Sequence, residues 1–276
     1  MKREALFAAA LAAVLPSLAA AQAPAAVASP AASPGPPARY IEARADQELK
    51  KMSTFLAGQQ RFALEADETF DEVPDGEPRR ELTNVRRMAV VRPNRVAADA
   101  TGDTLNRASW YDGKTITILD KEHNNYGVIE APATIDATLD KIADYGIALP
   151  LMDLLYSDPY AVLTEDVTYG RYLGIHLAAG VPCHHLVFSQ ETIEWQIWID
   201  ASDQPLPRRM VISYVDEPDE PKYSATIRRW KLDPQFTDEL FTFEAPEGAT
   251  KMDAKAMNLP EEGDKPAAAP APGGGR

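Results

Sequence analysis

The residues best suited to chemistry in this sequence stand together in the stretch PCHHLVFS, where Cys183 is followed by His184 and His185. A thiol and imidazoles are zinc ligands, and a thiol beside an imidazole can also serve as a nucleophile. The stretch is typical of a β-strand, in which successive side chains point to opposite faces. Cys183 and His185 then face away from His184, so a metal would need distant ligands such as His123 or His176. We therefore expect an ordinary strand with a small buried cysteine, and no metal site.

Other catalytic signatures are missing from the sequence. It contains neither a GxSxG elbow nor an HExxH helix, and its only glycine cluster, GGGR, is at the end of the chain. Carboxylate pairs occur, as in Glu165 with Asp166 and Glu191 with Glu194, and we interpret them as solvated charges. We expect a protein that is not an enzyme and that needs no cofactor.

Basic residues recur in pairs on segments with strand character. The pairs are Arg79 with Arg80, Arg86 with Arg87, Arg208 with Arg209, and Arg228 with Arg229. Cross-strand pairing with the many acidic residues explains most of them. A sharper hypothesis is that Arg208 and Arg209 lie at the mouth of a cavity and meet a lipid headgroup phosphate.

Large apolar side chains are concentrated in two neighbouring segments. In TIEWQIWID, Trp195 and Ile197 share one face with Ile193 and Ile199, and in the next segment Met210 and Tyr214 continue an apolar face. For any single one of these residues, an ordinary core position is the favoured interpretation. Taken together, they can also form the wall of an apolar cavity.

The first half of the chain combines a helical period with a strand period. RYIEARADQELKKMSTFLAG predicts an amphipathic helix that ends near Gly58. Its apolar face consists of Tyr40, Leu49, Met52, Phe55 and Leu56. From Arg61 the period becomes two, and about six strands follow, including a hairpin at WYDGKTITIL.

The second half begins with helices and returns to strands. TIDATLDKIADYG predicts a helix with Thr134 as its N-cap and Gly146 at its end. LPLMDLLYSDP predicts a second short helix that stops at Pro159. About six further strands are expected up to the segment LFTFEAP, joined by brief turns as in a meander.

The two ends of the chain differ from its middle. Residues 1–21 have the charged start, apolar centre and small-residue exit of a secretory signal peptide, and residues 22–38 form a linker rich in Pro and Ala. Residues 39–253 have the length of one domain, and residues 254–276 are expected to be a disordered tail. No cysteine stands directly after the apolar run, where a lipid would be attached, so we expect an exported periplasmic protein that is not lipidated.

The composition limits the partners. The formal net charge of −14 argues against binding nucleic acid. A single cysteine excludes an intramolecular disulfide framework, so an ordinary core must stabilise the chain.

The expected fold is α+β but mainly β, with one large curved antiparallel sheet, an unclosed half-barrel, and helices packed over its concave face. A sheet of that size encloses more apolar surface than a few helices cover, which favours a cavity.

Several of these segments also carry a resemblance to known proteins. LPLMDLLYSDPY, YLGIHLAAGVPCHHLVF, EWQIWIDASDQPLPRRMVISY and FTFEAPEGA resemble a bacterial family of predicted periplasmic proteins of unknown function. That family is similar to the LolA/LolB/LppX group of lipoprotein carriers. The resemblance implies a half-barrel whose hollow accepts lipid chains, and a soluble shuttle, because the lipidated cysteine of LolB-like and LppX-like members is missing here.

We therefore expect a monomeric periplasmic protein that binds a lipid or another hydrophobic ligand between sheet and helices. The helices from Thr134 to Tyr156 would act as a lid. The residues expected to form the cavity wall and the lid are Phe188, Trp195, Ile197, Met210, Tyr214, Met152 and Leu155. The alternative is a scaffold protein that fills the same space with its own side chains and binds an envelope protein through a sheet edge.

Overall fold

The computed structural model describes residues 39–73, 78–144 and 151–253. The predicted signal peptide (1–21), linker (22–38) and tail (254–276) lie outside the described residues, as does Gly146, the predicted end of the second helix. Within the described residues, no helix is both long enough and apolar enough to cross a membrane.

One sheet of 13 strands dominates the fold, as expected from the long run of period-two segments. The strands of the first half are β1 (Tyr40–Ile41), β2 (Arg61–Glu72), β3 (Arg80–Val91), β4 (Arg95–Gly102), β5 (Asn106–Tyr111), β6 (Thr115–Asp120) and β7 (Asn125–Glu130). Those of the second half are β8 (Tyr169–Ala178), β9 (Val181–Ser189), β10 (Ile193–Asp200), β11 (Pro207–Tyr214), β12 (Lys222–Leu232) and β13 (Thr250–Lys251).

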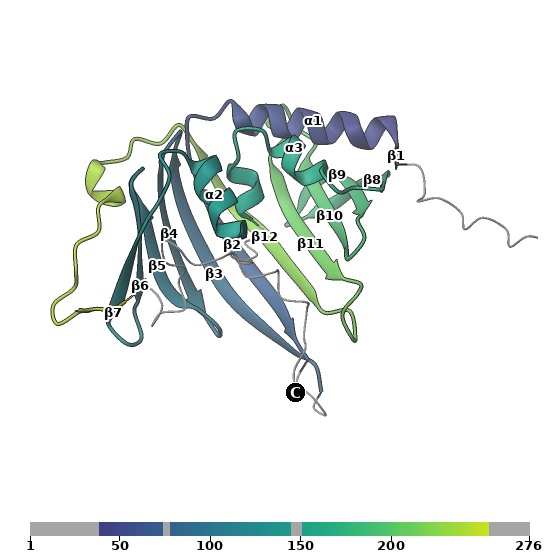
Figure 1. Ribbon diagram of the computed structural model, residues 1–276. Helices are drawn as coiled ribbons and strands as arrows, with labels where there is room; N and C mark the ends of the chain where they lie inside the picture. Colours follow the sequence, from purple (N-terminus) through teal and green to yellow (C-terminus); the bar gives the residue numbers. More distant parts are fainter. Residues whose placement is uncertain (1–38, 74–77, 145–150, 254–276) are drawn as a thin grey trace, which may run out of the picture. The chain divides into compact units, whose positions relative to one another are not determined.

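The order of the strands across the sheet is β1-β8-β9-β10-β11-β12-β2-β3-β4-β5-β6-β7-β13. Neighbours are antiparallel except at the two ends, where β1 pairs in parallel with β8 and β13 in parallel with β7. Each half of the chain is therefore a meander, and the meanders join where β12 pairs with β2. The sheet curves around the helices and remains unclosed, which confirms the predicted half-barrel (Figure 1).

Helix α1 (Ala43–Ala57) covers one half of the concave face, where it contacts β8, β9 and β10. Its apolar stripe of Leu49, Met52 and Leu56 is fully buried, as the helical period predicted. Tyr40 does not belong to this stripe, contrary to expectation. It lies in β1, where its N–H donates to the Thr168 carbonyl at 2.9 Å, because the chain first pairs with the sheet edge and only then turns into the helix.

Three further helices lie between the two meanders in sequence and on the same concave face. They are α2 (Ile135–Asp144), the 3₁₀ helix η1 (Met152–Leu155) and α3 (Pro159–Thr164). Thr134 caps α2, because its hydroxyl accepts a hydrogen bond from the Ala137 N–H at 3.3 Å. Pro159 does not stop a helix as predicted but begins α3, where Asp158 is the N-cap; a proline fits the first turn because its missing N–H has no partner there.

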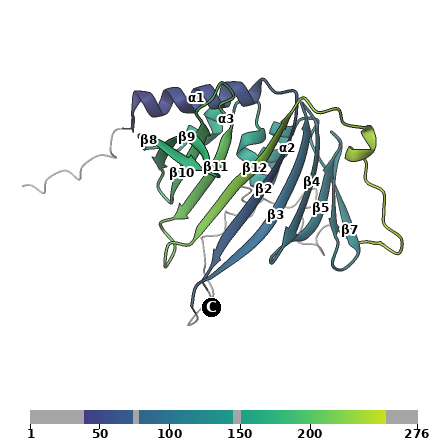
Figure 2. The same cartoon turned by 180° about the vertical axis from the view of Figure 1, so that it is seen from behind.

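The segment LFTFEAP is not a strand, contrary to expectation. It overlaps a second 3₁₀ helix, η2 (Asp238–Phe241), in the connection between β12 and β13. Figure 2 shows this connection passing from the end of β12 toward β7. Phe241 packs against Ala89 and Ala97, and the Phe243 ring lies 5.1 Å from that of Trp110. The alternating phenylalanines thus anchor a crossing segment to the outer face of the sheet.

Candidate functional site

A cavity of about 390 Å³ lies on the concave face, between the strands of the first meander and the helical segment that follows it. Most of the residues that line it are apolar. On the sheet side they include Val96, Ala98, Ala100, Leu105, Ala108, Trp110, Tyr111, Ile116, Ile118 and Ile129, and on the helical side Ile135, Leu139, Ile142, Met152 and Leu155. Its volume is within the range of about 300–1,000 Å³ that is usual for small-molecule sites.

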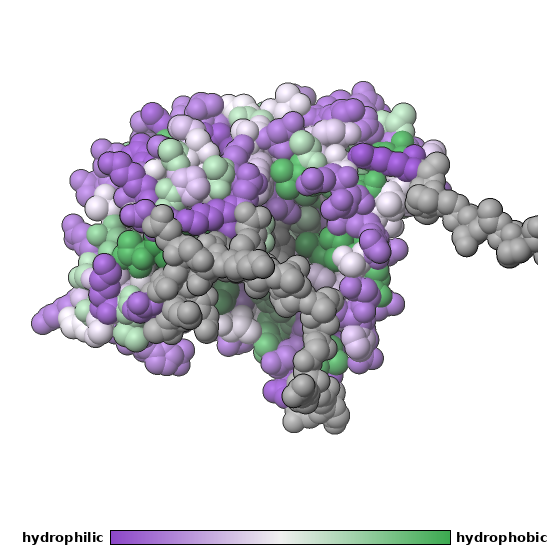
Figure 3. Space-filling view, viewed as in Figure 1, coloured by the Kyte–Doolittle hydropathy of each residue, from purple (hydrophilic) through white to green (hydrophobic). Residues whose placement is uncertain are grey.

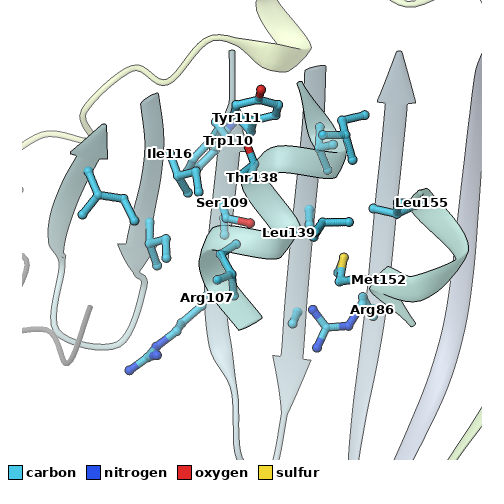
Figure 4. Close-up of a pocket in the computed structure, with 18 of the residues that line it drawn as sticks. Arg86, Arg107, Ser109, Trp110, Tyr111, Ile116, Thr138, Leu139, Met152 and Leu155 are labelled. Carbon is cyan, nitrogen blue, oxygen red and sulfur yellow. The ribbon is translucent and has the colours of Figure 1, made fainter. Parts of the chain in front are cut away.

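The cavity exists because small side chains meet a short helix. Strands β4 and β5 contribute Ala98, Ala100 and Ser109, which leave space below the apolar stripe of α2. Figure 4 shows α2 lying across these strands, with Leu139 and Ser109 near the middle of the site. On the same face of the molecule, apolar side chains gather below the helices and hydrophilic ones cover most of the periphery (Figure 3).

The other half of the concave face is filled by side chains. The rings of Phe188 and Trp195 are stacked with centroids 4.3 Å apart, and both residues are buried. Ile197 and Met210 are buried in the same core, and Tyr214 is packed against it. Alternation therefore placed these residues on the interior face correctly, but none of the five lines the cavity, whereas Met152 and Leu155 do. Contact of any of the seven with a ligand stays a prediction.

The two arginines expected at a cavity mouth have other partners. Arg208 forms an ion pair with the buried carboxylate of Asp200, with an Nη2–Oδ2 distance of 2.7 Å. The guanidinium of Arg209 lies over the ring of Trp198, 5.3 Å from its centroid. Neither arginine lines the cavity; the basic residues that do are Arg86 and Arg107, of which only Arg86 belonged to a predicted pair.

A buried polar network adjoins the cavity through Arg86. Glu68 is only 2% exposed, and its Oε1 accepts hydrogen bonds from Arg86 Nε at 2.8 Å and from the Tyr223 hydroxyl at 2.9 Å. The other carboxylate oxygen of Glu68 is buried and has no hydrogen-bond partner among the described residues. The pKa of the Tyr223 hydroxyl is raised by burial and by the adjacent Glu68 carboxylate, which keeps it a donor.

Hydrogen bonds join helix α2 to the end of η1 and attach both to the sheet, on the α2 side through Lys141 Nζ, which donates to the Glu130 carbonyl of β7 at 3.1 Å. The Tyr156 hydroxyl donates to Asp140 at 3.0 Å, and the Ser157 N–H donates to Asp136 at 3.0 Å. The Arg92 guanidinium of the sheet donates to the Leu155 carbonyl at the end of η1. We call the described parts of the segment from Thr134 to Tyr156, residues 134–144 and 151–156, the lid.

The stretch with Cys183, His184 and His185 alternates as the strand period predicted. Burial raises the pKa of the Cys183 thiol to about 11, so it stays protonated at neutral pH and is a poor nucleophile. His185 stacks on Trp198 with ring centroids 3.9 Å apart, whereas the His184 imidazole shares a hydrogen bond of 3.1 Å with the Tyr172 hydroxyl. Within the described ranges, no group of three His, Cys, Asp or Glu side chains is arranged to hold a metal ion.

Two further hollows lie elsewhere on the described residues. One of about 410 Å³ lies between the outer face of β12, β2, β3, β4 and β5 and the connection that carries η2, and it includes Phe236 and Leu240. The other, about 740 Å³, is more polar and lies beside α1, where Lys51, His184 and Asp203 are among its residues. Because these hollows are more polar or more open to solvent, the cavity beneath the lid is the candidate site.

Fold and site together define a class of protein: an open antiparallel sheet whose concave face is filled on one half and hollowed into an apolar cavity on the other. Residues 45–254 match the model of the DUF2092 family, described as a predicted periplasmic protein, and the chain belongs to this family. The match confirms the resemblance to predicted periplasmic proteins that the sequence segments indicated. A search of curated proteins finds no match.

Several solved structures are similar to this chain in fold. An uncharacterized conserved protein from Thermus thermophilus is 10% identical, with a TM-score of 0.45, and the match covers 76% of this chain and 99% of that one. The lipoprotein LppX of Mycobacterium tuberculosis is 10% identical, with a TM-score of 0.40 and coverage of 70% and 97%. A LolA superfamily protein from Nitrosomonas europaea is 11% identical, with a TM-score of 0.38 and coverage of 72% and 97%.

Proposed function

We propose that the protein is a non-enzymatic periplasmic carrier that binds the apolar chain of a lipid or another amphiphile in the cavity beneath the lid. The observation that carries the proposal is the lining, in which aliphatic and aromatic side chains surround about 390 Å³ on both the sheet side and the lid side. Burial of an apolar chain there would contribute about 25 cal/mol for each Å² removed from water. We also propose that the protein is exported by an N-terminal signal peptide, that it is a monomer and that it is not lipidated.

Ligand entry requires the lid to move away from the sheet. The hydrogen bonds of Tyr156 and Ser157 to α2 join the two parts of the lid, so that α2 and η1 move together. The Ile135 N–H donates to the Pro93 carbonyl at 2.8 Å and thereby attaches the start of the lid to the turn before β4. We propose that the lid moves away from the sheet, and that opening breaks the hydrogen bonds from Arg92 to the Leu155 carbonyl and from Lys141 Nζ to the Glu130 carbonyl.

The alternative of a scaffold protein predicts a core filled by its own side chains. The hollow beneath α2 favours the carrier over that alternative, because a filled core would leave no space of this size. A protein partner in the envelope stays a prediction.

The first test is direct identification of a ligand. Full-length protein, purified from the periplasm without detergent, would be measured by native mass spectrometry and its lipids extracted. We expect one discrete additional mass for each chain. A bare polypeptide mass, together with no uptake after mixed lipids are added, would contradict the proposal.

A cavity-filling substitution locates the binding. Ser109→Phe places a large ring in the middle of the cavity, so we expect at least tenfold weaker binding of the neutral apolar probe N-phenyl-1-naphthylamine. Ser213→Phe is the matched control, because Ser213 lies on β11 outside the three hollows. Equal probe binding by Ser109→Phe and the unaltered protein would show that the probe binds elsewhere.

A further inference from the structure

The charges that line the cavity differ from those of the whole chain. The sequence has 42 acidic and 28 basic residues. Among the described residues that line the cavity, however, the only charged ones are Arg86 and Arg107, and there is no Asp or Glu. In an acidic protein, a lining with arginine alone is selective for a ligand that brings negative charge.

The two arginines differ in how their charge is balanced. Arg86 is paired with the buried carboxylate of Glu68 through its Nε, and no hydrogen bond from its terminal nitrogens occurs among the described residues. Arg107 is exposed and has no ion pair or hydrogen bond from its side chain within the part of the chain that the structure describes. Asp120 lies opposite Arg107 on β6, but its carboxylate is engaged by His123. Arg107 therefore contributes a guanidinium group that is free to bind an anion, and Arg86 contributes donors that are held in place by Glu68.

The two arginines make one end of the cavity positively charged and leave the other end apolar. In Figure 4, Arg86 and Arg107 lie toward the same end of the site, and Tyr111, Trp110 and Ile116 lie toward the other. Most of the lining between the two ends is apolar. A molecule with an anionic end and an apolar chain matches this arrangement, because its chain is buried while its charge meets the guanidinium groups near solvent.

We infer that the ligand is an anionic amphiphile, with a carboxylate or a phosphate ester at one end of its chain, and that Arg107 recognises that group with Arg86 beside it. The inference rests on the proposed function, because it identifies the chemical class of the ligand in the same cavity. It replaces Arg208 and Arg209, which the sequence indicated for this role, by the two arginines that line the site.

The test compares ligands of equal chain length in displacement of N-phenyl-1-naphthylamine from the full chain at pH 7.5. Decanoate and decyl phosphate are the anionic ligands, decanol is the neutral one, and inorganic phosphate is the anion without a chain. We expect at least one anionic ligand to displace the probe at about five- to tenfold lower concentration than decanol, and inorganic phosphate not to displace it.

Substitution then assigns the preference to a residue. We expect Arg107→Gln to reduce the preference for the anionic ligand to about twofold or less while decanol binds as before. Arg229→Gln is the matched control, because Arg229 is an exposed arginine on β12 that does not line the cavity. Its preference is expected to equal that of the unaltered protein.

The failures of the two proposals are distinguishable. If the probe binds and decanol displaces it as well as both anionic ligands do, the anionic headgroup is refuted but the apolar cavity is not. If the preference survives Arg107→Gln or is lost equally in Arg229→Gln, Arg107 is not the recognising residue. If the probe does not bind at all, the proposed function itself fails.

Discussion

Asp153 is an acidic residue within η1, on the lid. Burial raises the pKa of its carboxyl group to about 6, above the ordinary value of 3.8. A carboxyl group whose pKa is higher in the folded state opposes folding when it is ionised. Its unfavourable contribution is therefore complete above pH 6 and disappears as the pH falls toward 4. Taking about 1.4 kcal/mol for each pKa unit, the cost at pH 7.5 is at most about 3 kcal/mol.

The first prediction follows from that pKa. Asp153→Asn removes the ionised form, so we expect the free energy of unfolding at pH 7.5 to rise by about 1–2 kcal/mol. At pH 4 the gain should shrink to about 0.5 kcal/mol or less, because the unaltered carboxyl group is then mostly protonated. Thermal or urea unfolding at the two pH values measures this, with Asp203→Asn in an exposed loop as the control of equal charge. A gain that is the same at both pH values would contradict the assignment.

The second prediction distinguishes a core residue from a cavity wall. Trp195 is buried and stacked on Phe188, so we expect Trp195→Ala to lower the free energy of unfolding by about 3–5 kcal/mol. Trp198→Ala, in the same strand but on the outer face, should cost clearly less. Urea unfolding measures both. If Trp195→Ala instead unfolds like the unaltered protein and binds the apolar probe more weakly, Trp195 contacts the ligand.

The third prediction is at the scale of the lid. Tyr156→Phe removes the hydroxyl that donates to Asp140 and thus one of the contacts between α2 and the end of η1. A hydrogen bond of this kind contributes about 0.5–1.5 kcal/mol, so amide hydrogen exchange in residues 135–143 should become about 2- to 10-fold faster. Tyr126→Phe is the control, since the Tyr126 ring packs on Phe243 away from the lid. Unchanged exchange in the lid of Tyr156→Phe would show that this bond does not hold it closed.

Most elements could be predicted from the sequence because their patterns are local. Alternation indicated β2 through β12, and the stripe of Leu49, Met52 and Leu56 indicated α1. The predictions that were wrong concern sequence patterns that are compatible with two different local structures. A proline can end a helix or begin one, as Pro159 does, and alternating phenylalanines can belong to a strand or anchor a crossing segment, as they do around η2.

The site was less predictable than the fold because a cavity depends on which element faces which. Trp195 and Ala98 both lie on β-strands, but Trp195 fills the space below its helices and Ala98 leaves space below α2. Whether a side chain fills the space or leaves it open depends on which helix packs over its strand. That packing involves residues that are distant in sequence. The one local signal was the run of small residues in RVAADATG and NRAS, which marks the strands that leave room.

At the scale of the whole molecule, the pairing of β12 with β2 is the long-range contact that joins the two meanders into one sheet. The Thr69 and Ser224 side chains form a hydrogen bond of 2.9 Å across β2 and β12, although they are 155 positions apart. Ending the chain at Pro221 removes β12 together with η2 and β13, and it separates the meanders. We therefore expect that variant to lose the cooperative thermal unfolding transition seen by circular dichroism.

A chain that ends at Asp253 keeps every described strand and is the matched control for that truncation. It should unfold at about the temperature of the full chain. A cooperative transition in the chain ending at Pro221 would show that a meander is stable without its partner.

The same pairing determines when folding can finish. A ribosome makes β2 well before β12, and Thr69 and Ser224 of these strands are 155 positions apart. Strand β2 can pair with β3 at once, but it lacks its second partner until β12 has emerged. Because long-range strand pairing is slow, the nascent chain lacks its complete sheet at least until β12 has been made. The export that we propose would benefit from this order of events, since late closure of the sheet would keep the chain in a form that can still cross a membrane.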